Sequence, residues 1–85
     1  MWVVYVIQNS GTKELYFGFT SNLKRRLDQH NSGLNVSTRR NAGEWILIYA
    51  EAYRDKSDAY NREQRLKHHG SGKNELLKRL SNSKL

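Results

Sequence analysis

Three apolar segments of the chain have the length and residue types of β-strands. Residues 2–9 are rich in Val, Ile and Tyr and almost continuously apolar, which is typical of a strand buried on both faces at the centre of a sheet. Residues 15–20 and 45–53 are the second and third predicted strands. Turn residues at positions 9–11 (Asn-Ser-Gly) separate the first two strands, so these two are expected to form a hairpin.

The polar stretch after the hairpin carries the signals of a helix. Three favourable N-cap residues at positions 20–22 precede Leu23 and Leu27, whose i, i+4 spacing defines one helical face. This helix is predicted to end near Asn31. Gly33 lies where a helix end commonly needs a left-handed residue.

The second half of the chain predicts a loop and two more helices. Residues 34–44 are polar and predict a surface loop before the third strand. Ser57 or Asp58 can cap a helix that runs to about His69. A break at Gly70-Ser71-Gly72 then precedes a short third helix, which carries its leucines on one side.

Together these elements predict one α/β domain over residues 1–85, in the order β-β-α-β-α-α, with a small three-stranded, mainly antiparallel sheet flanked by helices. The chain has no cysteine, which excludes a disulfide framework and a thiolate metal site. Its apolar runs are too short to cross a bilayer, and its start lacks the basic region and cleavage site of a signal peptide. We therefore expect a soluble, cytoplasmic protein with no membrane partner.

The charge balance favours a polyanionic partner. Fifteen Lys and Arg oppose eight Asp and Glu, which gives a formal net charge of +7. Such an excess in a small domain is typical of nucleic-acid binding. The alternatives are that the charge only maintains solubility or reflects association with the ribosome. Phosphate contacts are predicted at several basic positions, among them Arg39, Arg40, Lys67 and Lys73.

Arg26 and His30 lie near the apolar face of the first predicted helix. At 100° per residue, Arg26 lies about 60° and His30 about 20° from Leu23. The two residues are also i, i+4 partners, so both side chains can point into one half-buried space. The alternative is structural: the arginine stem covers the edge of the core, and the histidine interacts with the helix dipole.

Glu63 lies inside the apolar stripe of the second predicted helix, with Ala59, Leu66 and Gly70. Removing a carboxylate from water is unfavourable unless a cation or a metal ion compensates its charge. Glu63 therefore either pairs with an arginine or coordinates a metal ion.

Two tyrosines and a glycine in the predicted hairpin are further candidate functional residues. Tyr5 and Tyr16 lie in its two strands and can approach each other across the ladder. Their hydroxyl groups can act as bases or position water, although such residues more often only pack. Gly18 inside a strand leaves a packing gap, which suggests close approach by a backbone or a ligand.

These residues, taken together, resemble a known family. Two short triplets, V-V-Y at 3–5 and Y-F-G at 16–18, are followed at family spacing by Arg26, His30 and a helical Glu63. This pattern resembles the GIY-YIG nuclease family, and the segment YFGFTSNLKRRLDQHNSG is especially similar to its small single-domain bacterial members. The resemblance covers essentially the whole chain. The chain departs from the family pattern in having Val-Val for Gly-Ile in the first triplet and Phe for Ile in the second.

The resemblance implies a role for each matched residue. Glu63 would be the sole protein ligand of a Mg²⁺ or Mn²⁺ ion. Tyr5 would be the base or would activate water, and the Tyr16 hydroxyl would assist it. Arg26 would bind the scissile phosphate and stabilise the transition state, and His30 would support proton transfer or position water.

By the same resemblance, the chain is expected to be a metal-dependent endonuclease that hydrolyses phosphodiester bonds in DNA, with a role in DNA repair or processing. Gly18 would keep the strand surface clear. Many members carry an Asn near the end of the domain, and Asn74 is the nearest candidate for this DNA contact. Low intrinsic sequence specificity is expected. Two alternatives stay open: a non-catalytic nucleic-acid-binding module on the same scaffold, and a nuclease that acts only when a partner protein recruits it.

Overall fold

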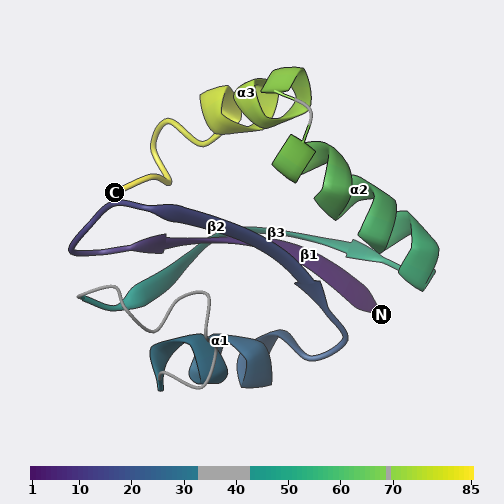
Figure 1. Cartoon of the computed structure of the whole chain (residues 1–85), viewed down its shortest axis with the longest axis horizontal. Helices are drawn as coiled ribbons and strands as arrows, with labels where there is room; N and C mark the ends of the chain where they lie inside the picture. The colour runs from purple at the N-terminus through teal and green to yellow at the C-terminus, as the bar shows by residue number, and fades with distance from the viewer. Residues whose placement is uncertain (33–42, 69) are drawn as a thin grey trace.

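The computed structural model describes residues 1–32, 43–68 and 70–85, and these residues contain three strands and three helices in the predicted order (Figure 1). None of the described helices is long and apolar enough to cross a membrane. The elements are β1 (Trp2–Asn9), β2 (Leu15–Thr20), α1 (Leu23–Asn31), β3 (Trp45–Tyr53), α2 (Lys56–His68) and α3 (Gly70–Arg79).

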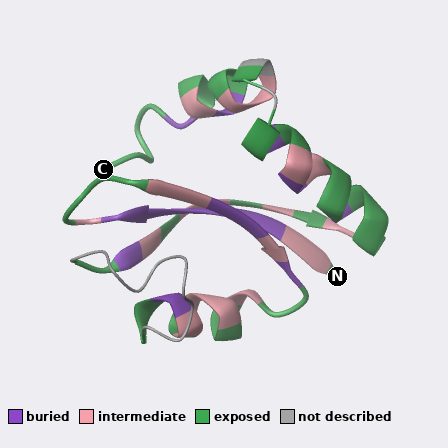
Figure 2. Ribbon diagram, in the orientation of Figure 1, coloured by how far each residue is buried: buried purple, intermediate pink, exposed green. Residues whose placement is uncertain are grey.

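β1 is the central strand of the sheet, as its continuous apolar sequence predicts. The strand order is β2-β1-β3, and both neighbours run antiparallel to β1. Every residue of β1 from Val4 to Asn9 is buried, which Figure 2 shows as a continuous buried stretch. Tyr5 lies opposite Gly18 of β2 on one side and Ala50 of β3 on the other. This register places the strands that carry Tyr5 and Tyr16 next to each other in the sheet.

Helices cover both faces of the sheet, so β1 contributes to two separate clusters of apolar side chains. Successive residues of a strand point to opposite faces. In Figure 1, α1 lies on one side of the sheet and α2 and α3 lie on the other. The α2–α3 side contains the buried residues Val4, Val6, Phe17, Ala59, Leu66, Leu76 and Leu80. The other cluster contains Tyr5, Ile7 and Trp45, with Tyr16, Leu23 and Leu27 packed against them.

Side chains fix α1 at both ends. Asn22 is its N-cap, and the Asn22 Oδ1 atom accepts a hydrogen bond of 3.1 Å from the Arg25 N–H. At the other end, the Asn31 side chain donates to the Trp45 carbonyl (3.0 Å) and accepts from the Trp45 N–H (2.6 Å). This double link holds the last residue of α1 on the first residue of β3. The helix ends at Asn31, as predicted, and Gly33, the predicted left-handed residue after it, lies outside the described residues.

Two predicted boundaries in the second half of the chain are wrong. α2 begins at Lys56 because Asp55, rather than Ser57 or Asp58, caps it: the Asp55 Oδ1 atom accepts a hydrogen bond of 2.8 Å from the Ser57 N–H. The segment Gly70–Gly72 is also not a break, because it forms the first turn of α3. Packing of the α3 leucines against the core outweighs the low helix propensity of glycine.

The chain enters β3 alongside the hairpin turn. The Ser10 N–H donates to the Glu44 carbonyl (2.9 Å), and the Ser10 Oγ atom accepts from the Glu44 N–H (3.0 Å). Gly43 has a φ of +89°, and a Cβ atom there would lie 2.7 Å from the Gly11 nitrogen, so the position requires glycine. The rest of the predicted loop, residues 34–42, lies outside the described residues.

Candidate active site

A buried hydrogen bond joins β1 to α1 at the centre of the candidate site. The Tyr5 hydroxyl oxygen lies 2.9 Å from the His30 Nε2 atom, and both residues are 2% exposed. The Tyr16 ring packs against the edge of the His30 ring with a centroid distance of 4.8 Å, and the Trp45 ring lies 6.4 Å from it. The structure thus brings three of the predicted site residues, Tyr5, Tyr16 and His30, into one cluster of aromatic rings.

Gly18 makes the space that the Tyr5 phenol occupies. A Cβ atom built at Gly18 would lie 2.5 Å from the Tyr5 hydroxyl oxygen and 2.7 Å from the ring carbon that bears it. Real Cβ atoms do not approach other atoms so closely. The gap at Gly18 is therefore filled by a side chain, and not by a backbone or a ligand as the sequence suggested.

Replacing Gly18 with alanine should displace Tyr5 and break its hydrogen bond to His30. Overpacking of this kind destabilises a domain by about 1–3 kcal/mol, and the Tyr5 phenol is a buried group that would have to move. We expect a lower melting temperature together with loss of the hydrogen bond between Tyr5 and His30. Thermal denaturation and NMR of the His30 imidazole on the same preparation measure the two effects. An alanine variant that melts like the wild type and keeps this hydrogen bond would contradict the packing argument.

Arg26 is a cation beside this pair. It is half-buried on α1, one turn before His30. Burial is the largest influence on the pKa of Tyr5 and of His30, and the Arg26 charge acts on both of them as well. Within residues 1–32, 43–68 and 70–85, no carboxylate forms an ion pair with Arg26. Its guanidinium group is therefore available to an anion such as a phosphate.

The protonation states of the Tyr5–His30 pair follow from their surroundings. Burial lowers the pKa of His30, and the Arg26 charge lowers it further, so the imidazole is neutral at pH 7. Burial raises the pKa of Tyr5; Tyr16 and Glu63 add to this effect, and Arg26 opposes it only in part. Tyr5 alone is consequently a poor base. As a pair, a neutral His30 can accept the Tyr5 proton at Nε2.

Glu63 lies on the buried face of α2, as predicted, and is 4% exposed. Its Oε1 atom lies 3.3 Å from the Lys67 Nζ atom and accepts a hydrogen bond of 3.1 Å from the Gln64 side chain. Of the two alternatives for Glu63, the arginine partner is not found among the described residues, because Lys67, one turn along the helix, pairs with the carboxylate. The Lys67 Nζ atom also lies 5.6 Å from the centre of the Tyr16 ring. Glu63 and Lys67 therefore meet the aromatic cluster at β2, an edge strand.

The residues at this position fit a hydrated divalent cation. In the described part of the chain, no group of three or more His, Asp or Glu side chains could hold a metal ion. Glu63 engages both of its described partners through Oε1, which leaves Oε2 for a further cation. Mg²⁺ usually keeps several waters and binds through one or two carboxylates together with substrate phosphates. A single carboxylate, with Arg26 also close enough to act on Tyr5, suits that coordination.

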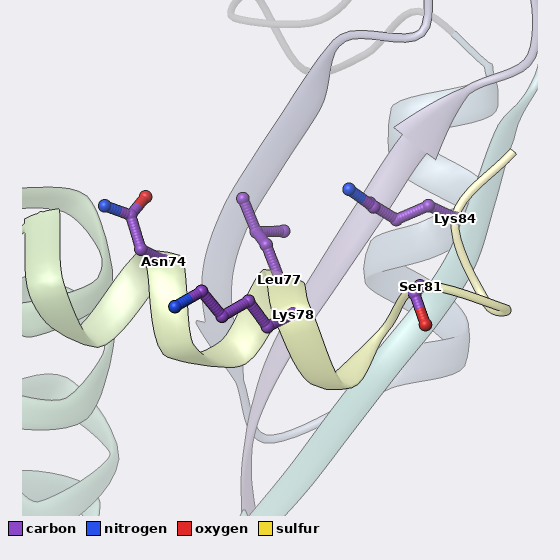
Figure 3. Close-up of a pocket in the computed structure, with 5 residues that line it drawn as sticks. All are labelled: Asn74, Leu77, Lys78, Ser81 and Lys84. Atoms are coloured by element: carbon purple, nitrogen blue, oxygen red, sulfur yellow. The ribbon is translucent and has the colours of Figure 1, made fainter.

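The other predicted DNA contacts lie on different parts of the chain. The Lys73 Nζ atom lies 5.5 Å from the centre of the Phe17 ring, so this lysine borders β2. Asn74 is exposed and lines a separate cavity along α3 (Figure 3). Arg39 and Arg40 lie outside the described residues.

Sequence reasoning missed two contributors to the site. The sequence predicts a DNA contact for Lys67 but not the ion pair that its ammonium group forms with Glu63. The i, i+4 spacing of the two residues could have indicated this ion pair. Asn31 holds the end of α1 on Trp45 and so positions the adjacent His30. This link joins residues 14 positions apart, and no local pattern marks it.

Comparison with known proteins agrees with the spacing of the motifs. The family described as the GIY-YIG catalytic domain matches residues 1–80. The UPF0213 protein YhbQ of Escherichia coli K12 is 36% identical over 66 residues, which cover 78% of this chain and 65% of that protein. The chain thus spans slightly less than two thirds of that relative. The UPF0213 protein of Vibrio campbellii is 36% identical over 76 residues, 89% of this chain and 72% of that protein.

A solved structure has the same fold. The solution NMR structure of the UPF0213 protein BH0048 from Bacillus halodurans superposes with a TM-score of 0.56 and 30% sequence identity. The match covers 94% of this chain and 85% of that protein. This similarity confirms the three-stranded antiparallel sheet with three helices.

Proposed function

Because the chain belongs to the GIY-YIG family of nuclease domains, we propose that it is a divalent-metal-dependent endonuclease that hydrolyses phosphodiester bonds in DNA. The observation that carries this proposal is the buried hydrogen bond between Tyr5 and a neutral His30, with the Arg26 charge beside it. Hydrolysis needs a proton acceptor, a cation for the phosphate and a carboxylate for the metal ion. Glu63 supplies the last of these.

Proton transfer runs through the Tyr5–His30 pair. The Tyr5 oxygen takes a proton from the attacking water while its own hydroxyl proton passes along the hydrogen bond to the His30 Nε2 atom, whose O···N distance is 2.9 Å. The water oxygen forms a bond to phosphorus, and the bond from phosphorus to the leaving oxygen breaks. The leaving oxygen takes a proton from solvent, and the imidazolium then releases its proton to solvent. Tyr5 is in this way a relay, and His30 is the acceptor that makes the relay possible at neutral pH.

Arg26 and Glu63 supply the electrostatics of the reaction. The planar guanidinium group of Arg26 would donate to two phosphate oxygens at once and stabilise the charge that develops on them. Glu63 would hold Mg²⁺ or Mn²⁺, which when bound neutralises phosphate charge and stabilises the leaving oxygen. Lys67 compensates the buried Glu63 carboxylate and lies over the Tyr16 ring, so it adds a second cation at the same edge of the sheet.

Activity should fall at acidic pH as His30 becomes protonated. Because burial and then Arg26 lower the pKa of His30, the midpoint of this loss should lie below about 6.5, the value for an unperturbed histidine. The profile of log(kcat/KM) against pH, which reports the free enzyme, should show this acidic limb. His30→Gln removes the titrating group, so its residual activity should lack the limb. A limb of unchanged midpoint in that variant would assign the titration to another group.

Folding stability should change in the same pH range. Between the lowered pKa of His30 and about 6.5, the unfolded chain binds a proton that the folded chain does not. The free energy of unfolding should therefore decrease as the pH falls through this window and level off below it. Urea denaturation at successive pH values measures this change, and His30→Gln should reduce it.

A single set of assays tests the proposed function. The purified protein is incubated with labelled single-stranded, duplex and flapped DNA, with Mg²⁺, with Mn²⁺ and with EDTA. We expect cleavage only in the presence of a divalent cation. DNA binding without cleavage of any substrate would favour the non-catalytic binding module instead.

We place this activity in the cytoplasm, in DNA repair or processing. Sequence specificity is proposed to be low, because the cations near the site suit phosphate groups, which carry no sequence information. Selectivity would then come from DNA structure or from a recruiting protein partner. Cleavage of unrelated sequences at similar rates would support this assignment, and strong preference for one sequence would contradict it.

A further inference from the structure

A basic cavity lies along α3, apart from the Tyr5–His30 cluster. It has a volume of about 490 Å³ and opens between α3 and the segment that follows it (Figure 3). Its lining consists of two lysines, an amide, a hydroxyl and one aliphatic side chain: Asn74, Leu77, Lys78, Ser81 and Lys84. No carboxylate lines it. The cavity therefore offers hydrogen-bond donors and positive charge with one apolar wall.

The two lysines of this cavity differ from three other lysines of the domain. The ammonium group of Lys67 pairs with a carboxylate, and those of Lys56 and Lys73 lie over aromatic rings. Lys78 and Lys84 have neither kind of partner among the described residues. Two uncompensated charges that line one cavity favour an anionic ligand.

The wall that carries Lys84 is fixed to the sheet. Leu80 is buried, and its carbonyl accepts 2.9 Å hydrogen bonds from the N–H groups of Ser83 and Lys84. The Leu85 N–H donates to the Gln8 Oε1 atom at 2.7 Å, and Gln8 is a buried residue of β1. Lys84 is thereby held opposite α3, and its side chain extends toward Leu77 in Figure 3.

The cavity begins where α3 contacts the face of β2 opposite to Tyr16, because Phe17 belongs to the α2–α3 cluster and Tyr16 packs against the other cluster. Lys73 lies over Phe17, the residue after Tyr16, and Asn74 is the next residue of α3. Because an α-helix rises about 1.5 Å per residue, Lys78 lies roughly 8 Å further along the helix axis than Lys73. One strand of nucleic acid can therefore extend from the edge of β2 along α3.

We propose that this cavity binds a backbone phosphate of the DNA strand that flanks the scissile phosphate, with Lys78, Lys84 and the Ser81 hydroxyl as donors. The inference rests on the proposed function. Leu77 would contact the deoxyribose. The lining contains no aromatic ring on which a base could stack, so recognition here is independent of sequence.

The test removes both charges and varies the length of the DNA. The cavity variant is Lys78→Gln/Lys84→Gln. The control variant is Arg54→Gln/Lys56→Gln, which removes two positive charges at the start of α2, the end that is remote from α3. Equilibrium binding is measured in EDTA, so that it does not depend on cleavage, with single strands of graded flank length. Thermal denaturation checks that both variants fold.

On long strands, Lys78→Gln/Lys84→Gln should bind about tenfold more weakly, as expected for loss of charged hydrogen bonds. The slope of log Kd against log salt should fall by about one unit or more. On strands too short to reach the cavity, the variant should bind like the wild type. The control variant should show no such dependence on length.

Three results would overturn the proposal. The first is equal binding of long strands by the cavity variant and the control, and the second is an equal loss of affinity for short and long strands. The third is that the cavity variant, unlike the control, no longer binds thymidine 5′-monophosphate but still binds DNA as the wild type does. The last result would indicate a site for free nucleotides. A wild type that binds DNA but does not cut it would contradict the proposed nuclease function and leave this comparison valid. A wild type that binds no DNA would overturn both.

Discussion

Glu63→Ala should abolish cleavage and leave DNA binding intact. The change removes the one carboxylate that is buried among the described residues, and with it the proposed protein ligand of the metal ion. Binding rests on lysines and arginines, so it should persist or increase slightly when one negative charge is lost. Gel-shift and Mg²⁺-dependent cleavage assays on the same protein measure the two properties separately.

The fold should survive this substitution. The Lys67 side chain is 38% exposed, so its ammonium group can turn into water when Glu63 is removed. Alanine is also a good helix former on an apolar stripe. We expect the free energy of unfolding to change by no more than about 1 kcal/mol. Glu75→Ala, an exposed carboxylate on α3, is the matched control and should cut normally. A Glu63→Ala protein that unfolds, or that cuts at the wild-type rate, would refute the metal role.

Arg26→Lys should lower the cleavage rate by about 10²-fold or more, the effect of removing one transition-state donor. Lysine keeps the positive charge but loses the planar guanidinium group that can donate to two phosphate oxygens. Because the charge persists, the lowered pKa of His30 and the affinity for DNA should change much less than kcat. Single-turnover kinetics separates the chemical step from binding.

The neighbouring arginine provides the control for this experiment. Arg25 is exposed, and its side chain lies on the same helix with the same charge. Arg25→Lys should cut at the wild-type rate. If both variants were equally slow, or both fully active, the assignment of Arg26 to the scissile phosphate would be wrong.

The sequence predicted most of the fold because each strand is marked by its own residues. The continuous apolar run of β1 predicted a central strand, and the antiparallel sheet and the element order are confirmed. The start of α2 was misplaced because several residues could cap it and only the folded backbone selects Asp55. The glycines of α3 were misjudged because tertiary packing outweighs local propensity.

The candidate site was predicted as a set of residues but not as a set of contacts. Helical spacing and the family resemblance singled out Arg26, His30 and Glu63. They did not show that Tyr5 is hydrogen-bonded to His30, because that bond joins residues 25 positions apart. The neutral state of His30 likewise follows from burial, which a sequence pattern does not report.

β1 is shared by both faces of the sheet, and this has a consequence for how such domains can change in evolution. Val4 and Val6 belong to one cluster, and Tyr5 and Ile7 belong to the other. A one-residue deletion inside β1 would shift the strand register and exchange the two faces, so that valines would enter the active site and a tyrosine hydroxyl would enter the aliphatic core. Substitutions on the Tyr5 side can alter chemistry while the aliphatic side keeps the domain folded. Related chains should therefore vary β1 by substitution while keeping its length.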